Sequence, residues 1–251
     1  MSLCEHCVGT FKHDNTPTGT MKKIGSVDTY VALPNSHYNR NTAVVLLTDV
    51  YGHCSNNHLL ADAFAASGFQ VYVPDQFDGD PITEEARATP GFDMWTQWLP
   101  KHGPAETRPS LDAFLAGLRD MGISSFFVTG YCFGGRYTLD LAFDNVQGLK
   151  AIAISHPGLI KVPEDFEVLR EKGKVPLLIN SCEVDPQFPV DAQQTVDGLL
   201  GNDVYTPGYL RTYWAGCTHG FACRGDVSIP QIRLGKEGAF KATVDWFTKY
   251  L

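Results

Sequence analysis

The stretch that decides the fold is "FFVTGYCFGG", residues 126–135. Its first half is a run of apolar and β-branched residues typical of a buried strand. Its second half holds Cys132 between Gly130 and Gly134, and Gly135 follows directly. A residue held on a sharp strand-to-helix turn needs small neighbours, which these glycines supply. The segment therefore predicts a strand, a tight turn carrying Cys132, and a helix that starts just after it.

Outward from this segment, apolar runs alternate with helical patterns, which is typical of a mostly parallel sheet with crossover helices. The expected strands are 43–49, 69–75, 125–131, 150–155, 175–181 and 209–215, and the expected helices are 56–68, 110–121, 189–200 and 236–250. The segment "MKKIGSVDTYVALP" (21–34) alternates around Gly25 and predicts an antiparallel pair of strands ahead of them. The last helix should present Phe240, Val244, Phe247 and Leu251 on one face.

The composition limits what the protein can do. With 251 residues, of which 43% are hydrophobic, the chain can bury one sizeable core, and we expect a single domain over residues 1–251. A net charge of −8 and the lack of a basic run argue against a nucleic-acid partner. We expect no membrane span and a cytoplasmic protein, because neither a secretory leader nor a long apolar run is visible. Seven cysteines without an export signal predict reduced thiols.

The position of Cys132 suits a nucleophile. It follows a strand at the sheet edge where ligands bind in open α/β folds, and a helix start favours thiolate over thiol. The backbone N–H of Phe133 would help to hold an oxyanion. The alternative is a small buried cysteine beside a tight turn, and the short Gly-x-Cys-x-Gly motif alone does not decide between the two.

Two later segments supply partners for Cys132 in the chain order nucleophile, acid, histidine. Asp185 stands in "CEVDPQFP" and His219 in "GCTHGFACRGD", each just after a predicted strand. A turn-forming aspartate and a loop histidine are the alternatives for these two. Glu183 is the rival acid and His156, in "SHPG", the rival base, although His156 follows the wrong strand for this order.

Taken together, "GYCFGG", "EVDPQFP", "THGFACRGD" and the upstream "LLTDVYG" resemble the dienelactone hydrolase family of α/β hydrolases, most closely its fungal members. The resemblance implies an α/β-hydrolase fold and no cofactor. It also implies Cys132 as nucleophile, His219 as base and Asp185 as the residue that orients it. By the same resemblance, the N–H groups of Phe133 and Val50 form the oxyanion hole.

The resemblance also suggests residues that bind substrate. Bacterial members have a glutamate after the first core strand that meets the thiol; here Asp49 stands there, and its role as thiol partner is open. Arg224 matches an arginine that clamps a substrate carboxylate, with a surface ion pair to Asp226 as the alternative. A second arginine would be Arg87 or Arg108. Cys182 stands where the family usually has glycine. The expected substrate-binding residues are Asp49, Tyr51, Trp95, Trp98 and Arg224.

The two tryptophans lie in the irregular segment 76–109, where they could line a pocket or simply pack on the core. Two clusters hold residue types that bind metals. The first is Cys4, His6, Cys7 and His13, and the second is Cys217, His219 and Cys223. We expect no metal, because neither cluster offers the four well-spaced ligands of a structural zinc site.

We therefore expect a cysteine hydrolase that opens lactones or cleaves small carboxylic esters through an acyl-enzyme. One alternative is a fungal biosynthetic enzyme that opens, releases or isomerises a metabolite ring with the same triad. Another is a redox-sensitive thiol protein without turnover. The expected partner is a small-molecule lactone or ester, and the sequence leaves a monomer and a homodimer both open.

Overall fold

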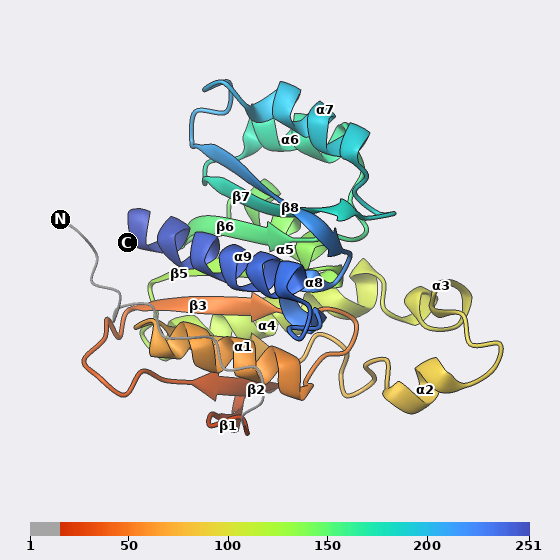
Figure 1. The fold of residues 1–251 in the computed structure, drawn as a ribbon. Helices are drawn as coiled ribbons and strands as arrows, with labels where there is room; N and C mark the ends of the chain where they lie inside the picture. Colours follow the sequence, from red (N-terminus) through yellow and green to blue (C-terminus); the bar gives the residue numbers. More distant parts are fainter. Residues whose placement is uncertain (1–15) are drawn as a thin grey trace.

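The computed structural model describes residues 16–251, which form one eight-stranded sheet covered by helices (Figure 1). The strand order is β1-β2-β4-β3-β5-β6-β7-β8. The strands are β1 (Thr20–Ile24), β2 (Val27–Ala32), β3 (Thr42–Leu47), β4 (Gln70–Pro74), β5 (Ser125–Tyr131), β6 (Leu149–Ser155), β7 (Leu177–Val184) and β8 (Tyr209–Thr218). Pairs from β4 to β8 are parallel, whereas β1–β2 and β2–β4 are antiparallel. The predicted mostly parallel sheet with an antiparallel start is confirmed.

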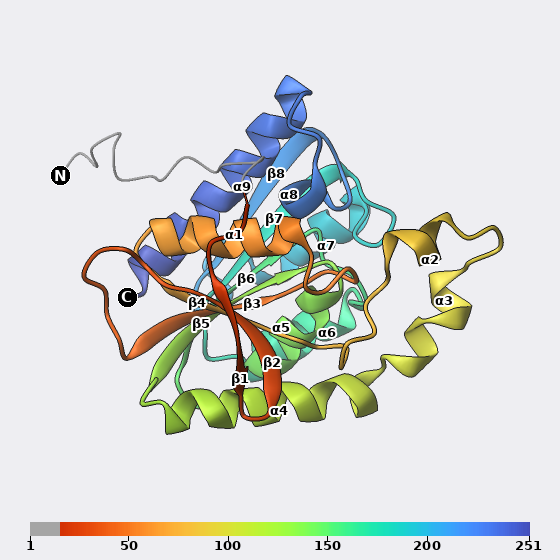
Figure 2. The same ribbon diagram turned by 90° about the horizontal axis from the view of Figure 1, so that it is seen from below.

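The helices cover both faces of this sheet (Figures 1 and 2). They are α1 (Ser55–Ala66), α2 (Glu84–Ala88), α3 (Met94–Gln97), α4 (Pro104–Asp120), α5 (Phe133–Phe143), α6 (Glu164–Lys172), α7 (Val190–Leu200), α8 (Phe221–Arg224) and α9 (Pro230–Lys249), with a 3-10 turn at Leu99–Lys101. Helices α1 and α9 pack on one face, and α4, α5, α6 and α7 pack on the other. Helices α2 and α3 form an arm that extends beyond the carboxyl ends of the parallel strands (Figure 2).

Alternating residues of the central strands feed two apolar layers, one on each face. In β3, Val44 faces the layer of α1 and α9, while Val45 faces the layer of α4 and α5. Aromatic rings pack in the layer of α1 and α9: the Phe247 ring stacks on that of Phe127, with centroids 4.8 Å apart, and is tilted against that of Phe64, with centroids 6.5 Å apart. Burial on both faces explains why these strands read as continuous apolar runs.

Two predicted helices are longer than expected. Helix α4 begins at Pro104 rather than at residue 110, and α9 begins at Pro230 rather than at residue 236. Proline fits the first turn of a helix, because a backbone N–H there would have no intrahelical acceptor and its absence costs no hydrogen bond. The expected place of Leu251 on the apolar face of the last helix is wrong, since it follows the helix end and is 66% exposed. No helix within residues 16–251 has the length and apolar character to cross a membrane.

Candidate active site

The turn between β5 and α5 places Cys132 at the carboxyl edge of the sheet. Its backbone is at φ 49° and ψ −110°, a conformation that side chains rarely adopt. A Cβ on Gly130 would lie 2.2 Å from Thr138 Oγ1, and one on Gly134 would lie 2.3 Å from the carbonyl oxygen of Leu47. Only glycine at these two positions allows α5 to lie so close to β3 and β5.

Backbone hydrogen bonds fix the turn against both neighbouring strands. The N–H of Cys132 donates to the carbonyl of Ser155 (3.2 Å), and the N–H of Gly134 donates to that of Thr48 (3.0 Å). The carbonyl of Cys132 accepts from Gly158 at 2.9 Å. The thiol is therefore held on a rigid support, with 7% of the residue exposed.

His219 and Asp185 meet at the ends of β8 and β7. His219 Nδ1 lies 2.8 Å from Asp185 Oδ1, and the Asp185 side chain is 1% exposed. The same carboxylate oxygen accepts the N–H groups of Gln187 (2.9 Å) and Phe188 (3.2 Å), which fix its orientation. The rival acid Glu183 instead accepts the N–H of Gly216 (2.7 Å), so it does not contact the histidine.

The charge state of His219 follows from these neighbours. Burial lowers the pKa of His219, but hydrogen bonds to Asp185 and Cys132 and the negative charges of both outweigh this and raise the pKa to about 10. Cys132 and Asp185 therefore act together to stabilise the imidazolium. The arrangement joins a thiol, an imidazole and a carboxylate at the carboxyl ends of β5, β8 and β7, with β6 between β5 and β7.

Two backbone N–H groups near Cys132 are free to donate. Phe133 is the first residue of α5, where helical N–H groups have no intrahelical acceptor. Val50 lies in the loop after β3, and its carbonyl accepts from Ile82 at 2.9 Å. Among residues 16–251, neither the N–H of Phe133 nor that of Val50 has a hydrogen-bond acceptor.

The rival base His156 packs against the ring of His219. It is fully buried, and its ring packs edge-on against that of His219 with centroids 5.1 Å apart. Its Nε2 lies 3.7 Å from the Cys223 sulfur, and its Nδ1 is buried without a partner among the described residues. Burial, followed by the charges of His219 and Arg224, lowers the pKa of His156 well below its usual value. This ring is therefore neutral.

Asp49 is fully buried, and its carboxylate accepts hydrogen bonds from four residues. Its Oδ2 accepts from Arg224 Nε (2.6 Å) and from the Cys223 thiol (3.3 Å), while its Oδ1 accepts from Asn57 Nδ2 (3.0 Å) and the N–H of Tyr51 (3.3 Å). Asp49, which stands where bacterial family members have the longer glutamate, thus pairs with an arginine. The contacts of Asp49 with Asn57 and Cys223 were not foreseen. Neither motif spacing nor periodicity shows a contact such as that with Cys223, which spans 174 positions of the chain.

The Arg224 guanidinium is bonded to Asp49 through Nε, while its side chain is partly exposed. Its guanidinium lies 4.6 Å above the Tyr51 ring, and its side chain is 28% exposed. Its partner is Asp49 rather than Asp226, whose carboxylate accepts from the N–H of Ser228. Among the described residues, no acceptor bonds its terminal Nη atoms.

The aromatic residues of the arm take different places. Trp98 is 5% exposed and its indole N–H donates to the carbonyl of Asp80 (2.8 Å). Its ring centroid lies 5.6 Å from that of Phe133, so it packs against the first residue of α5. Trp95, on α3, is 49% exposed. The structure therefore does not bring the two tryptophans together.

Neither candidate for a second arginine joins Arg224. Arg108 pairs with Asp112 and Asp144 along α4, and Arg87 is exposed on α2. Gln187, whose role the sequence did not indicate, lies with its amide nitrogen 3.4 Å from His219 Nε2.

Metal binding finds no support in the part of the chain that is described. No group of three His, Cys, Asp or Glu side chains within residues 16–251 converges on a common point. The cluster of Cys4, His6, Cys7 and His13 lies outside the described residues.

The sheet order, the strained turn after β5 and the acid and histidine after β7 and β8 define an α/β hydrolase. Residues 27–251 match the Dienelactone hydrolase family, and the chain belongs to that family. It is a hydrolase of the lactone and ester class.

Named relatives agree with this assignment. The chain is 31% identical to "Hydrolase pyvD" of Aspergillus violaceofuscus, over 98% of this chain and 96% of that protein. It is 29% identical to "Dienlactone hydrolase 1" of Gibberella moniliformis, over 99% and 94%. A putative dienelactone hydrolase from Klebsiella pneumoniae has the same fold, with a TM-score of 0.75 and 19% identity over 94% of this chain and 100% of that one.

Proposed function

We propose that this protein hydrolyses lactones or small carboxylic esters through a covalent acyl-enzyme on Cys132. The observation that carries the proposal is the hydrogen bond of 2.8 Å between His219 and Asp185 beside a thiol on a strained turn. A nucleophile, a base and an orienting acid in this chain order are the parts that acyl transfer needs. Family membership supplies the reaction class, and these residues supply a mechanism for it.

In the first half of the reaction, the Cys132 sulfur attacks the ester carbonyl as thiolate, with its proton held by His219. The C–S bond forms, and the negative oxygen of the tetrahedral intermediate is held by the free N–H groups of Phe133 and Val50. When the C–O bond of the ester breaks, His219 gives its proton to the leaving alkoxide. In a lactone this alkoxide remains tethered to the acyl group.

In the second half, water cleaves the thioester. His219, now neutral, accepts a proton from water as it attacks the acyl carbon. The tetrahedral intermediate collapses, the C–S bond breaks, and the thiolate and imidazolium pair is restored. Asp185 keeps Nδ1 protonated throughout, so that Nε2 is the atom that exchanges protons.

Arg224 would select substrates that carry a carboxylate. Asp49 and the Tyr51 ring fix the guanidinium, while its terminal nitrogens remain able to form paired, charge-assisted hydrogen bonds. Asp49 then acts through Arg224, as a positioning residue.

The test is a hydrolysis screen against cyclic lactones, enol lactones and linear aryl esters, run in parallel with the Cys132→Ala variant. The expected result is turnover that depends on Cys132, with a burst of leaving group as the acyl-enzyme accumulates. A thiol protein that acts only as a redox sensor would show neither. Turnover that survives in Cys132→Ala would overturn the assignment of the nucleophile.

A further inference from the structure

The last strand of the sheet has a long free edge. β8 has ten residues, and only Cys217 among them is buried, whereas nearly all of β5 is buried. Two large apolar side chains stand out, since Leu210 is 45% exposed and Tyr213 is 46% exposed. A long, exposed and apolar edge strand is a template for pairing with another chain.

The backbone of this edge is available for pairing. The carbonyls of Gly208 and Thr212 face β7, since they accept from the N–H of Leu177 (2.9 Å) and the hydroxyl of Ser181 (2.7 Å). Because successive residues of a strand point their backbone groups to opposite sides, Tyr209, Arg211 and Tyr213 point theirs away from β7. Among residues 16–251, none of these outward groups has a hydrogen-bond partner.

The unpaired part of the β8 edge ends before Ala215. The side-chain amide of Gln231 donates to the carbonyl of Ala215 (2.9 Å) and thereby closes the edge beyond Tyr213. At the opposite edge of the sheet, β1 has only five residues and exposes Lys22 and Lys23, which is a common protection against strand addition. The single charge of β8, Arg211, is already paired with Asp197.

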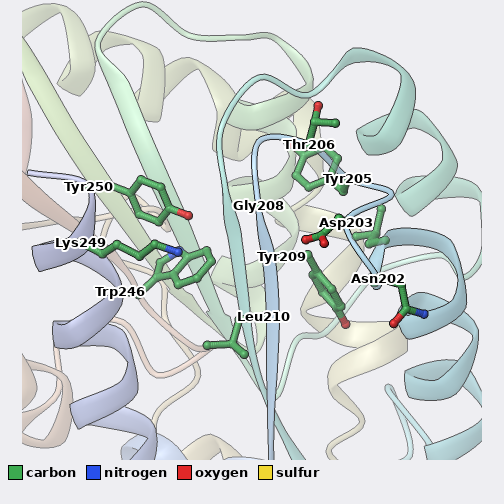
Figure 3. A pocket seen from close by; sticks show the side chains of 12 residues that line it. Asn202, Asp203, Tyr205, Thr206, Gly208, Tyr209, Leu210, Trp246, Lys249 and Tyr250 are labelled. Atoms are coloured by element: carbon green, nitrogen blue, oxygen red, sulfur yellow. The ribbon is translucent and has the colours of Figure 1, made fainter.

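A pocket of about 450 Å³ lies where β8 begins (Figure 3). Trp246 of α9 and Tyr250, just after this helix, stand on one side of Gly208, and Tyr205 and Tyr209 stand on the other. The pocket therefore straddles the edge strand instead of opening into one face of the sheet. Such a shape fits a segment of a protein that crosses the sheet edge.

We propose that a second copy of this chain binds here, with the two β8 strands antiparallel about a twofold axis at Thr212. This register places Leu210 opposite Trp214 of the partner subunit and Arg211 opposite Tyr213 of the partner subunit. Both pairs are complementary, one apolar and one a cation facing an aromatic ring. The twofold axis makes each pair twice.

The neighbouring register is less favourable. An axis at Arg211 would place the two Arg211 side chains, each bonded to its own Asp197, opposite each other and would leave no cation opposite Tyr213. An axis at Thr212 also aligns Gly208 with Gly216 of the partner subunit. Gly216 lies against Gln231 of α9, and two residues near Gln231 in the sequence, Ile229 and Leu234, are 46% and 59% exposed. The pocket beside Gly208 would receive them.

Sedimentation velocity over a range of protein concentrations tests this dimer. The parent protein should sediment with twice the mass of the chain at about 100 µM, a concentration at which a micromolar dissociation constant gives mostly dimer. Tyr213→Lys places a second cation opposite Arg211 and should weaken the dimer at least about tenfold. Tyr213→Glu places an acid there and should weaken it less. Met121→Lys, at a site 53% exposed beyond α4, is the matched control and should leave the dimer intact.

A second variant tests the backbone pairing itself. Tyr213→Pro removes an N–H that points away from β7, so it leaves the sheet intact, as proline does at edge positions. It should give a folded monomer with an unchanged far-ultraviolet circular dichroism spectrum. A parent protein that is monomeric at about 100 µM, or a dimer that survives both Tyr213→Lys and Tyr213→Pro, would overturn the proposal. Equal weakening by Tyr213→Lys and Tyr213→Glu would overturn this register.

Discussion

At the scale of single residues, Cys132 carries the clearest sign of a functional constraint. A side chain at φ 49° and ψ −110° costs on the order of 1–3 kcal/mol and persists only where the surroundings enforce it. Here the enforcement comes from hydrogen bonds of the turn to Ser155 and Thr48. The strain falls on the residue that must present its sulfur to a substrate, which is where such strain is useful.

Replacing Asp185 tests the orienting acid. Asp185→Asn should leave the fold intact and lower kcat about a hundredfold or more, because His219 loses control of its tautomer. Glu183→Gln is the matched control, since Glu183 bonds a backbone N–H instead of the histidine. Steady-state kinetics on one ester measure both variants. The reverse ranking would give the orienting role to Glu183.

Arg224 can be tested with a substrate and its neutral analogue. Charge-assisted hydrogen bonds to a carboxylate contribute about 1.5–3 kcal/mol. Arg224→Ala should therefore lower kcat/KM for a carboxylated lactone about tenfold to a hundredfold and leave its methyl ester nearly unchanged. Equal losses on both substrates would remove the argument for an anionic substrate and would leave the triad unaffected.

His156 should make the protein sensitive to acid. Its pKa lies well below 6.5 in the folded protein because burial disfavours the charged ring. Below pH 6.5 the unfolded chain therefore binds a proton that the folded protein does not, and stability falls as the pH falls. Asparagine tolerates the positive φ of 37° at this position. His156→Asn should therefore fold and should reduce the slope of the unfolding free energy against pH by an amount equivalent to up to about one proton. Urea denaturation between pH 5 and 7.5 measures it, and parallel slopes for the two proteins would contradict the assignment.

At the scale of elements, close backbone approach explains how the turn of the β1–β2 hairpin rests on α4. A Cβ on Gly117 of α4 would lie 2.4 Å from the backbone nitrogen of Gly25. Gly25 itself has φ 54°, and its own Cβ would lie 1.9 Å from the carbonyl oxygen of Ala113. Two facing glycines thus let a turn and a helix touch through their backbones.

A pair of glycine replacements tests this contact. Gly117→Ala should destabilise the protein by about 1–3 kcal/mol, because the hairpin must move away from α4. Gly198→Ala, in α7, should stabilise it by about 0.5–1 kcal/mol, since a Cβ there meets nothing within 4 Å and alanine favours a helix. Chemical denaturation compares the two. Equal changes in the free energy of unfolding would show that helix propensity, and not the contact between Gly117 and Gly25, determines the effect of Gly117→Ala.

The sequence predicted the long elements better than the short ones. All of the expected strands formed, because runs such as 125–131 are buried on both faces and keep their pattern. Helices α2, α3 and α8, each of four or five residues, were not predicted, since so few positions carry no periodicity. The nine-residue α6 was also missed, because Phe166 and Leu169 are its only buried residues. The starts of α4 and α9 were placed too late because their first turns are polar and carry proline.

The candidate site follows the same division. Cys132, Asp185 and His219 were predictable because each follows a recognisable strand in a fixed order. The contact of Asp49 with Arg224 was not, since only the folded sheet brings the loop after β3 against α8.

At the scale of the whole molecule, the described cysteines differ sharply in their surroundings. Cys182 and Cys217 are fully buried in the layer under α9, and burial raises the pKa of both, that of Cys182 to about 12. The half-buried Cys54 also has a pKa raised by burial. Cys132 alone among the described cysteines is a hydrogen-bond partner of His219, whose pKa is raised to about 10.

Iodoacetamide labelling with peptide mapping tests this contrast across the folded protein. In a background with Cys4→Ser and Cys7→Ser, Cys132 should react fastest by at least about tenfold at pH 7, because iodoacetamide attacks the thiolate. The His219→Gln variant should slow Cys132 and leave Cys54 unchanged, since only Cys132 depends on the imidazolium. Labelling in urea is the control that shows all five remaining thiols to be reactive once exposed. If Cys54, Cys182 or Cys217 reacts first in the folded protein, or if His219→Gln does not slow Cys132, then the thiolate and imidazolium pair does not exist and the nucleophile must be sought elsewhere.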